Sequence, residues 1–137
     1  RPTGPAIQGF AGQFEMTVNH VQVKRVYDAP SPADGARVLV DRLWPRGVRK
    51  ERAHLSLWLK DAAPSPALRQ WFDHRADRWR EFTLRYRAEL KTNPAIARLH
   101  ELQRQGAVTL LYAARDENMN HARVLAEFLA ASCRKRS

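Results

Sequence analysis

Arginines, aromatic residues and a histidine follow three apolar segments that read as strands. These polar residues are Arg25, Tyr27 and Asp28 after the first segment, Asp41, Arg42, Trp44 and Arg46 after the second, and Tyr112, Arg115, Asp116, Asn118, Asn120 and His121 after the last. Ligands of open parallel sheets collect outside the carboxyl ends of the strands, where loops turn and helix N-termini present free N–H groups. The sequence therefore predicts a binding site at this edge.

Arg42 and Arg46 bracket Trp44 and Pro45. A planar guanidinium group suits carboxylate or phosphate oxygens, and an indole ring offers a stacking face. The alternative is structural: Asp41 pairs with an arginine, and Trp44 covers the sheet edge. On the first interpretation the ligand is a small anion, and the ligand-binding residues are Arg25, Tyr27, Asp41, Arg42, Trp44, Arg46, Arg115 and Asn120.

His121 falls in the first turn of the last predicted helix, where the helix dipole disfavours the charged imidazolium. If the protein is an enzyme, His121 or Asp116 would accept a proton and Tyr112 would donate a hydrogen bond. The alternatives are a histidine bonded to a nearby carbonyl group and an aspartate that caps the helix. Because no nucleophile pairs with His121 by spacing, the sequence leaves open whether the protein is an enzyme.

Metal and nucleotide motifs are not found in the sequence. No two of the 5 histidines stand at metal-ligand spacing, and Cys133 is the single cysteine, which excludes an internal disulfide and a site of several thiolates. The segment DENMNH lacks the glycines of a phosphate-cradling loop. We therefore expect no metal and no cofactor.

Strands and helices alternate along the chain. Strand patterns cover residues 21–28, 37–44, 55–60 and 107–114, and in the third of these Leu55, Leu57 and Leu59 share one face. Helix signals are the pair Ser65–Pro66, a stripe of Trp79, Phe82, Tyr86 and Leu90, the pair Asn93–Pro94 with a stop at Gly106, and an apolar face after residue 120. This order predicts an α/β fold with a small, largely parallel three- or four-stranded sheet flanked by four or so helices.

The chain has 137 residues, about the size of one domain, and its 44% hydrophobic and 28% charged residues exclude a disordered or fibrous protein. Residues 1–15 lack patterning and read as a leader or an added extension. Residues 16–132 form the single α/β domain, and residues 133–137 are a basic tail. No apolar run reaches the roughly 20 residues of a membrane span, and no segment resembles a signal peptide, so we expect a cytoplasmic protein.

A net charge of +10 favours anionic partners. Besides a small anionic ligand, the alternative is a nucleic-acid-binding regulator that uses the basic helical region 65–91, including Arg78 and Arg85. Spacing places Trp71, Trp79 and Tyr86 inward, so these arginines would form an ordinary solvated face. A third possibility is a scaffold protein that forms a homodimer.

The segments KRVYDAPSPADGARVLVDRLWPRGVRKE, WLKDAAPS, LRQWF and VTLLYAARDENMNHARVLAEFL resemble the YeaO-like family. This family is a branch of a larger bacterial group, domain of unknown function 488. The match spans about residues 21–130, and VLVDRLWPRG is its most specific element. The resemblance implies a small cytosolic α/β domain with no established activity.

At the last strand and the loop after it, the sequences of the wider group resemble LLCAE and CHR, whereas this chain has LLYAA and NHA. His121 is kept, but Tyr112 and Asn120 stand in the places of the cysteines. Thiol or metal chemistry therefore does not carry over to this chain. The motif residues on which the resemblance would place a site are Arg25, Tyr27, Asp41, Arg42, Trp44, Arg46, Tyr112, Asp116 and His121.

Overall fold

A computed structural model describes residues 21–136 of the chain. Four parallel strands form one sheet in the order β1-β4-β2-β3. They are β1 (Val21–Arg25), β2 (Ala36–Leu39), β3 (Leu57–Trp58) and β4 (Val108–Tyr112). The predicted α/β fold and its parallel sheet are confirmed. The predicted leader, residues 1–15, lies outside the described residues.

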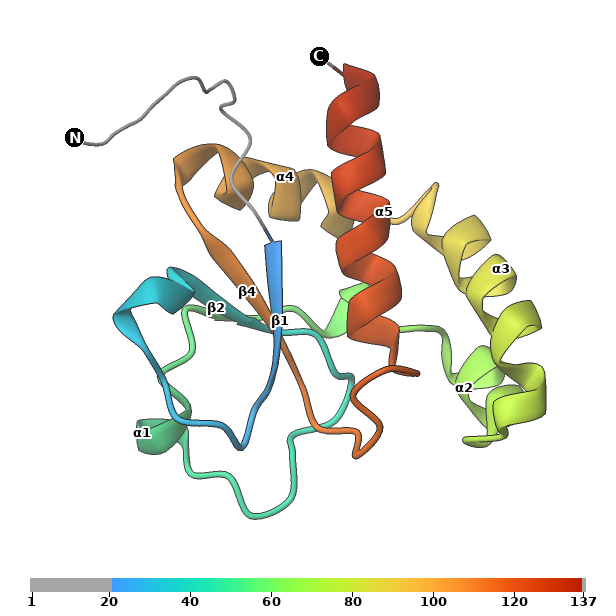
Figure 1. The fold of residues 1–137 in the computed structure, drawn as a ribbon, viewed down its shortest axis with the longest axis horizontal. Coiled ribbons are helices and arrows are strands. Elements are labelled where there is room, and N and C mark those ends of the chain that lie inside the picture. The colour runs from blue at the N-terminus through green and yellow to red at the C-terminus, as the bar shows by residue number, and fades with distance from the viewer. Residues whose placement is uncertain (1–20, 137) are drawn as a thin grey trace, which may run out of the picture.

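Most of the helical structure covers one face of this sheet (Figure 1). The helices are α1 (Lys50–Ala53), α2 (Pro66–Phe72), α3 (Trp79–Leu90), α4 (Ala95–Gln105) and α5 (His121–Arg136). Because α5 extends to Arg136, residues 133–136 of the segment predicted as a tail are helical. No helix within residues 21–136 has both the length and the apolar character that a bilayer crossing requires.

The helix-covered face holds the larger core. Helix α5 packs against β1, β4 and α3. Apolar side chains alternate along the strands, so every second residue of β2 and β4 reaches this core. Its fully buried members include Val38, Val40, Val108, Leu110, Tyr86, Leu90, Leu99, Leu125 and Leu129. The predicted stripe of α3 is confirmed, since Phe82, Tyr86 and Leu90 are buried and Trp79 packs against them.

The other face, which we call the loop-covered face, carries no helix longer than α1 among the described residues. Val26, Leu39 and Leu111 form a small core there, covered by side chains that include Trp44 and Trp58. The two indole rings meet edge to face at 5.2 Å. Segment 41–56 therefore takes the place that a helix has on the opposite face.

The prediction of one shared face for the leucines of segment 55–60 is wrong. Leu57 and Leu59 pack on the helix-covered face, whereas Leu55 packs on the loop-covered face beside Trp58. The strand β3 spans only Leu57–Trp58. Outside these two residues the chain does not keep the strand period, so the alternation of side chains does not extend to Leu55.

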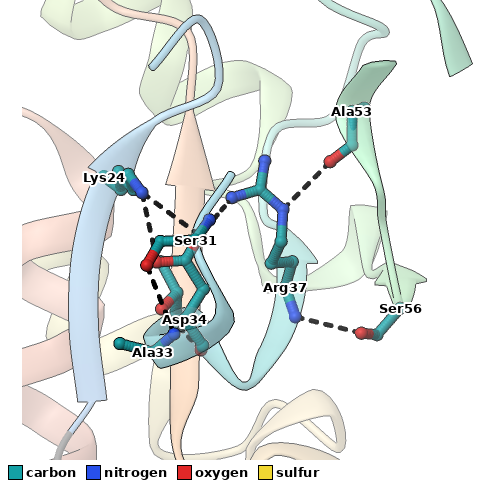
Figure 2. Close-up of polar contacts among 8 residues, drawn as sticks. Lys24, Ser31, Ala33, Asp34, Arg37, Ala53 and Ser56 are labelled. Atoms are coloured by element: carbon teal, nitrogen blue, oxygen red, sulfur yellow. Dashed lines mark hydrogen bonds and ion pairs between the residues drawn. The ribbon is translucent and has the colours of Figure 1, made fainter. Parts of the chain in front are cut away.

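A buried ion cluster, formed by Lys24, Asp34 and Arg37, joins β1 to the chain before β2 (Figure 2). One Asp34 carboxylate oxygen, Oδ2, accepts hydrogen bonds from the Ser31 N–H group at 3.0 Å and from Arg37. Lys24 Nζ lies 3.1 Å from the other oxygen. Burial would raise the pKa of Asp34, but the Ser31 N–H group and the two cations together lower it.

The ion cluster also fixes neighbouring segments. Arg37 Nε donates to the carbonyl oxygen of Ala53 at 3.0 Å, and the Thr109 hydroxyl donates to the Asp34 carbonyl oxygen at 2.7 Å. Gly35 follows with φ of +64°, and a Cβ atom there would lie 2.2 Å from the carbonyl oxygen of Ala107. Only glycine fits this close approach to the segment before β4.

Candidate functional site

A hollow of about 170 Å³ opens beyond the carboxyl ends of β2 and β4. A neighbouring hollow of about 110 Å³ shares several lining residues, so the two form one site. We call it the arginine–histidine hollow, after Arg42, Arg69, His74 and His121. Its wall also includes Asp41, Pro64 and Ala114.

Helix α5 begins at His121 because its preceding residue is a helix cap. Asn120 is buried, its Oδ1 accepts the N–H group of Arg123 at 3.0 Å, and its amide donates to the Asp116 carbonyl oxygen at 2.9 Å. The Asp116 carboxylate accepts the N–H groups of Met119 and Asn118, both at 2.8 Å, and these bonds lower its pKa. Asn120 and Asp116 thus hold the loop that places His121 in the wall of the hollow.

His121 is held through its Nε2 atom. This atom lies 2.9 Å from the carbonyl oxygen of Val40 and 3.2 Å from Asp41 Oδ1. A carbonyl oxygen only accepts, so the hydrogen-bond network assigns the proton to Nε2. Asp41 is fixed in turn, because its Oδ2 accepts the Ala113 N–H group at 3.0 Å. The other ring nitrogen, Nδ1, has no partner within residues 21–136, which leaves it available to a ligand.

Arg42 and Arg69 supply the guanidinium groups. Arg42 Nη2 contacts the carbonyl oxygens of Ala63 and Pro64 at 3.4 and 3.3 Å, and its buried Nε has no partner in the part of the chain that the structure describes. Arg69 lies exposed on α2, and none of the described acidic residues pairs with it. Both groups can donate hydrogen bonds to an anion in the hollow.

The sequence did not indicate Arg69 and His74 as site residues. Helix α2 is capped by Ser65, whose hydroxyl accepts the Leu68 N–H group at 3.2 Å. After the helix, Asp73 and His74 both adopt left-handed backbone angles, with φ of 49° and 55°. This turn brings His74 to the hollow. No glycine or asparagine stands at these two positions, so the usual signal of such a turn is missing.

Five of the eight predicted ligand-binding residues do not line the arginine–histidine hollow: Arg25, Tyr27, Trp44, Arg46 and Arg115. Trp44 donates from Nε1 to the Val48 carbonyl oxygen at 2.8 Å and covers the sheet, as in the structural alternative. Arg25 Nε donates to the Ala114 carbonyl oxygen at 3.0 Å. The Tyr27 hydroxyl donates to the Arg46 carbonyl oxygen at 2.9 Å, and the Arg46 side chain is exposed outside the hollow.

Tyr112 and Arg115 also lie outside the lining of the arginine–histidine hollow. Tyr112 belongs to the core of the helix-covered face, and burial, reinforced by the charge of Glu117, raises the pKa of its phenol. Arg115 is exposed and lines an adjoining cavity of about 420 Å³ with Asp116 and His74. Of the predicted residues, the structure therefore brings Asp41, Arg42, Asn120 and His121 to one place, with Arg115 and Asp116 beside it.

The charges around the arginine–histidine hollow are predominantly positive. Arg42 and Arg69 are cations, whereas Asp41 is the one carboxylate among the described lining residues. That carboxylate already faces His121 and the Ala113 amide. No group of three or more His, Cys, Asp or Glu side chains in the described residues could hold a metal ion. The arrangement suits an anion.

Arginines of the 65–91 region largely engage partners within the protein. Ion pairs join Arg75 to Asp77, Arg85 to Glu81 and Arg87 to Glu127. The guanidinium groups of Arg78 and Arg85 also lie 5.1 and 4.3 Å from the centroid of a Trp71 ring. These contacts reduce the positive charge that the region can offer to a polyanion.

The chain matches a family model, DUF488-N3i, described as the inactive DUF488-N3 subclade, over residues 20–137. It is 46% identical over 109 residues to the uncharacterized protein Rv3073c of Mycobacterium tuberculosis, covering 80% of this chain and 92% of that protein. It is 41% identical over 111 residues to the uncharacterized protein YeaO of Escherichia coli, covering 80% and 96%. No solved structure matches the chain. The chain therefore belongs to the DUF488-N3i family, within the YeaO-like DUF488 group that its motifs resemble.

Proposed function

We propose that the protein binds a small phosphate- or carboxylate-bearing molecule in the arginine–histidine hollow. The observation that carries this proposal is the charge of the wall: two guanidinium groups and two imidazoles line it together with one carboxylate, Asp41, whose Oδ2 accepts the Ala113 N–H group. An anion entering the hollow would therefore meet two guanidinium donors and a single carboxylate, which lies beside His121.

Each lining residue has a distinct part in this proposal. Arg69 is exposed and would make the paired hydrogen bonds to the anion, and Arg42, which lines the same hollow, would add a further donor. The free Nδ1 of His121 would accept a hydrogen bond from a hydroxyl group of the same ligand. Drug-sized ligands take cavities of about 300–1,000 Å³, and the two hollows of about 170 and 110 Å³ together stay below this range, so the site suits a smaller molecule.

Binding without turnover is the function that we favour. Asp41 orients the imidazole of His121 in the way that a carboxylate orients a histidine base, which is the one observation that favours acid–base chemistry. The matched family is, however, described as an inactive subclade. We therefore assign His121 a role in holding the ligand.

Thermal unfolding in the presence of phosphate, pyrophosphate or citrate tests the proposal. An anion at about one hundred times its Kd should stabilise the wild-type protein by about 2.7 kcal/mol. Arg69→Ala should lose most of this stabilisation. Arg46→Ala and Arg98→Ala remove the same charge from exposed positions outside the hollow, and both variants should still be stabilised by the anion. If the anion stabilised Arg69→Ala as much as the wild type but no longer stabilised Arg46→Ala, the proposed site would be rejected.

A further inference from the structure

A larger cavity, of about 490 Å³, lies on the loop-covered face. The residues that line it include Tyr27, Asp28, two arginines, Arg49 and Arg52, and apolar residues such as Val48. None of its lining residues lines the arginine–histidine hollow. The anion-binding function proposed above does not use it.

Tyr27 presents a fixed aromatic ring at this cavity. The side chain is 47% exposed, yet its hydroxyl is held by the Arg46 carbonyl oxygen at 2.9 Å. The Arg25 guanidinium lies 5.0 Å from the ring centroid and is itself bonded to the carbonyl oxygens of Ala113 and Ala114. A ring that is already positioned loses little conformational entropy when a planar group stacks on it.

Four exposed cations lie in a short stretch of chain that contributes to the cavity wall: Arg46, Arg49, Lys50 and Arg52. Among residues 21–136, none of them has an acidic partner. Glu51 is the one acid between residues 46 and 52, so the stretch carries 4 − 1 = +3. The region 65–91 differs, since four of its arginines, Arg75, Arg78, Arg85 and Arg87, pair with acids or cover Trp71.

These groups match the three parts of a nucleotide. An aromatic ring stacks on a base, guanidinium groups bind phosphate, and a carboxylate such as Asp28 accepts hydrogen bonds from a base amino group or a sugar hydroxyl. We propose that the cavity binds one nucleotide of a single-stranded nucleic acid. Tyr27 stacks on its base, and Arg49 and Arg52 hold its phosphates.

A strand fits better than a free nucleotide because the positive charge extends past the cavity. Arg46 and Lys50 do not line it, although they neighbour residues that do. On a strand they meet the phosphates on either side of the bound nucleotide. Single-strand binding proteins combine such a basic track with aromatic rings, and the binding is tolerant of sequence.

Fluorescence anisotropy with a labelled oligothymidylate of about twelve nucleotides tests this inference in the full-length protein. Affinity should fall as salt rises from about 50 to about 200 mM, because strand binding releases counterions. Competition by unlabelled thymidine monophosphate distinguishes binding of a strand from binding of a free nucleotide. Weak competition supports a strand, whereas competition as strong as that of unlabelled oligothymidylate overturns the strand assignment.

Variants then locate the binding surface. Tyr27→Ala should weaken binding roughly fivefold to a hundredfold, the usual range for loss of one stacked base, and Tyr27→Phe should weaken it less. Arg49→Ala with Arg52→Ala should reduce the salt slope by about 1.4, since each phosphate contact contributes about 0.7 for single strands. The matched control, Arg98→Ala with Arg104→Ala on α4, removes the same charge elsewhere and should change the slope less.

Three outcomes would overturn the inference. One is an oligonucleotide that shows no salt-dependent binding to the wild-type protein. Another is wild-type affinity in Tyr27→Ala combined with reduced affinity in Arg80→Ala, which would move the strand to the 65–91 region. The third is a decrease of the salt slope in the α4 control as large as that in the Arg49→Ala, Arg52→Ala variant, which would mean that the strand is attracted by the overall charge. Arg69→Ala should leave strand binding unchanged, so failure here is distinguishable from failure of the anion site.

Discussion

The substitution Asp34→Asn removes the negative charge of the buried ion cluster while it keeps the shape of the side chain. The side chains of Asp34 and Arg37 are 4% and 5% exposed, so water cannot replace the carboxylate beside Arg37. Arg37 Nη2 is also buried without a partner among the described residues. The substitution therefore leaves a cation in the protein interior without a counter-charge.

Breaking a buried ion pair by removing one partner costs about 3–5 kcal/mol of unfolding free energy. Lys24, the second cation, has a side chain that is 23% exposed and can be partly solvated, which places the expected loss near the lower limit, at about 3 kcal/mol. Domains of this kind have about 5–15 kcal/mol of stability in total. We therefore expect a melting temperature about 10 °C lower.

Urea unfolding of wild type and Asp34→Asn between pH 7 and pH 3 gives the measurement. The folded pKa of Asp34 is lowered below its ordinary value of 3.8, so the ionised carboxylate stabilises the protein above that value. This stability is lost as pH falls through the lower, folded pKa. The difference in unfolding free energy between the two proteins should thus be constant from pH 7 to about 5 and narrow in acid.

Two controls make this experiment specific. Asp77→Asn removes an ion pair in which the aspartate side chain is 66% exposed, and its urea midpoint at pH 7 should match that of the wild type. Adding Arg37→Met to Asp34→Asn removes the unpaired cation and should recover part of the lost stability. Equal midpoints for wild type and Asp34→Asn at pH 7, or a gap that does not narrow in acid, would refute the reasoning.

Two further predictions concern stability. Gly35→Ala should destabilise the protein by at least about 2 kcal/mol, because its Cβ would lie 2.2 Å from the Ala107 carbonyl oxygen at a positive φ, whereas Gly106→Ala has open space and should stay within about 0.5 kcal/mol in the same urea titration. Tyr86→Phe removes the buried hydrogen bond to the Ala62 carbonyl oxygen and should cost about 1–3 kcal/mol; a wild-type melting temperature would show that this bond contributes nothing.

Local patterns in the sequence predicted most of the fold. Ser65 and Pro66 mark the start of α2, the stripe from Trp79 to Leu90 defines the buried side of α3, and Gly106 ends α4. These signals depend on residues within one or two turns of each other, so they can be read without the rest of the chain. The strand β3 is the exception. It contains only two residues, too few for the alternation of side chains to indicate on which face of the sheet the neighbouring residues lie.

The sequence by itself determined which residues follow the carboxyl ends of the strands, since that needs only the order of strands and loops. Tertiary structure alone decided on which face of the sheet each residue lies. Asp41, Arg42 and His121 meet at the arginine–histidine hollow beyond the ends of β2 and β4, whereas Tyr27 and Arg49 line a separate cavity on the loop-covered face. It also brought Arg69 and His74 to the site through a left-handed turn. The physical reason is that a loop can cross either face of a sheet, and its path depends on packing against distant residues.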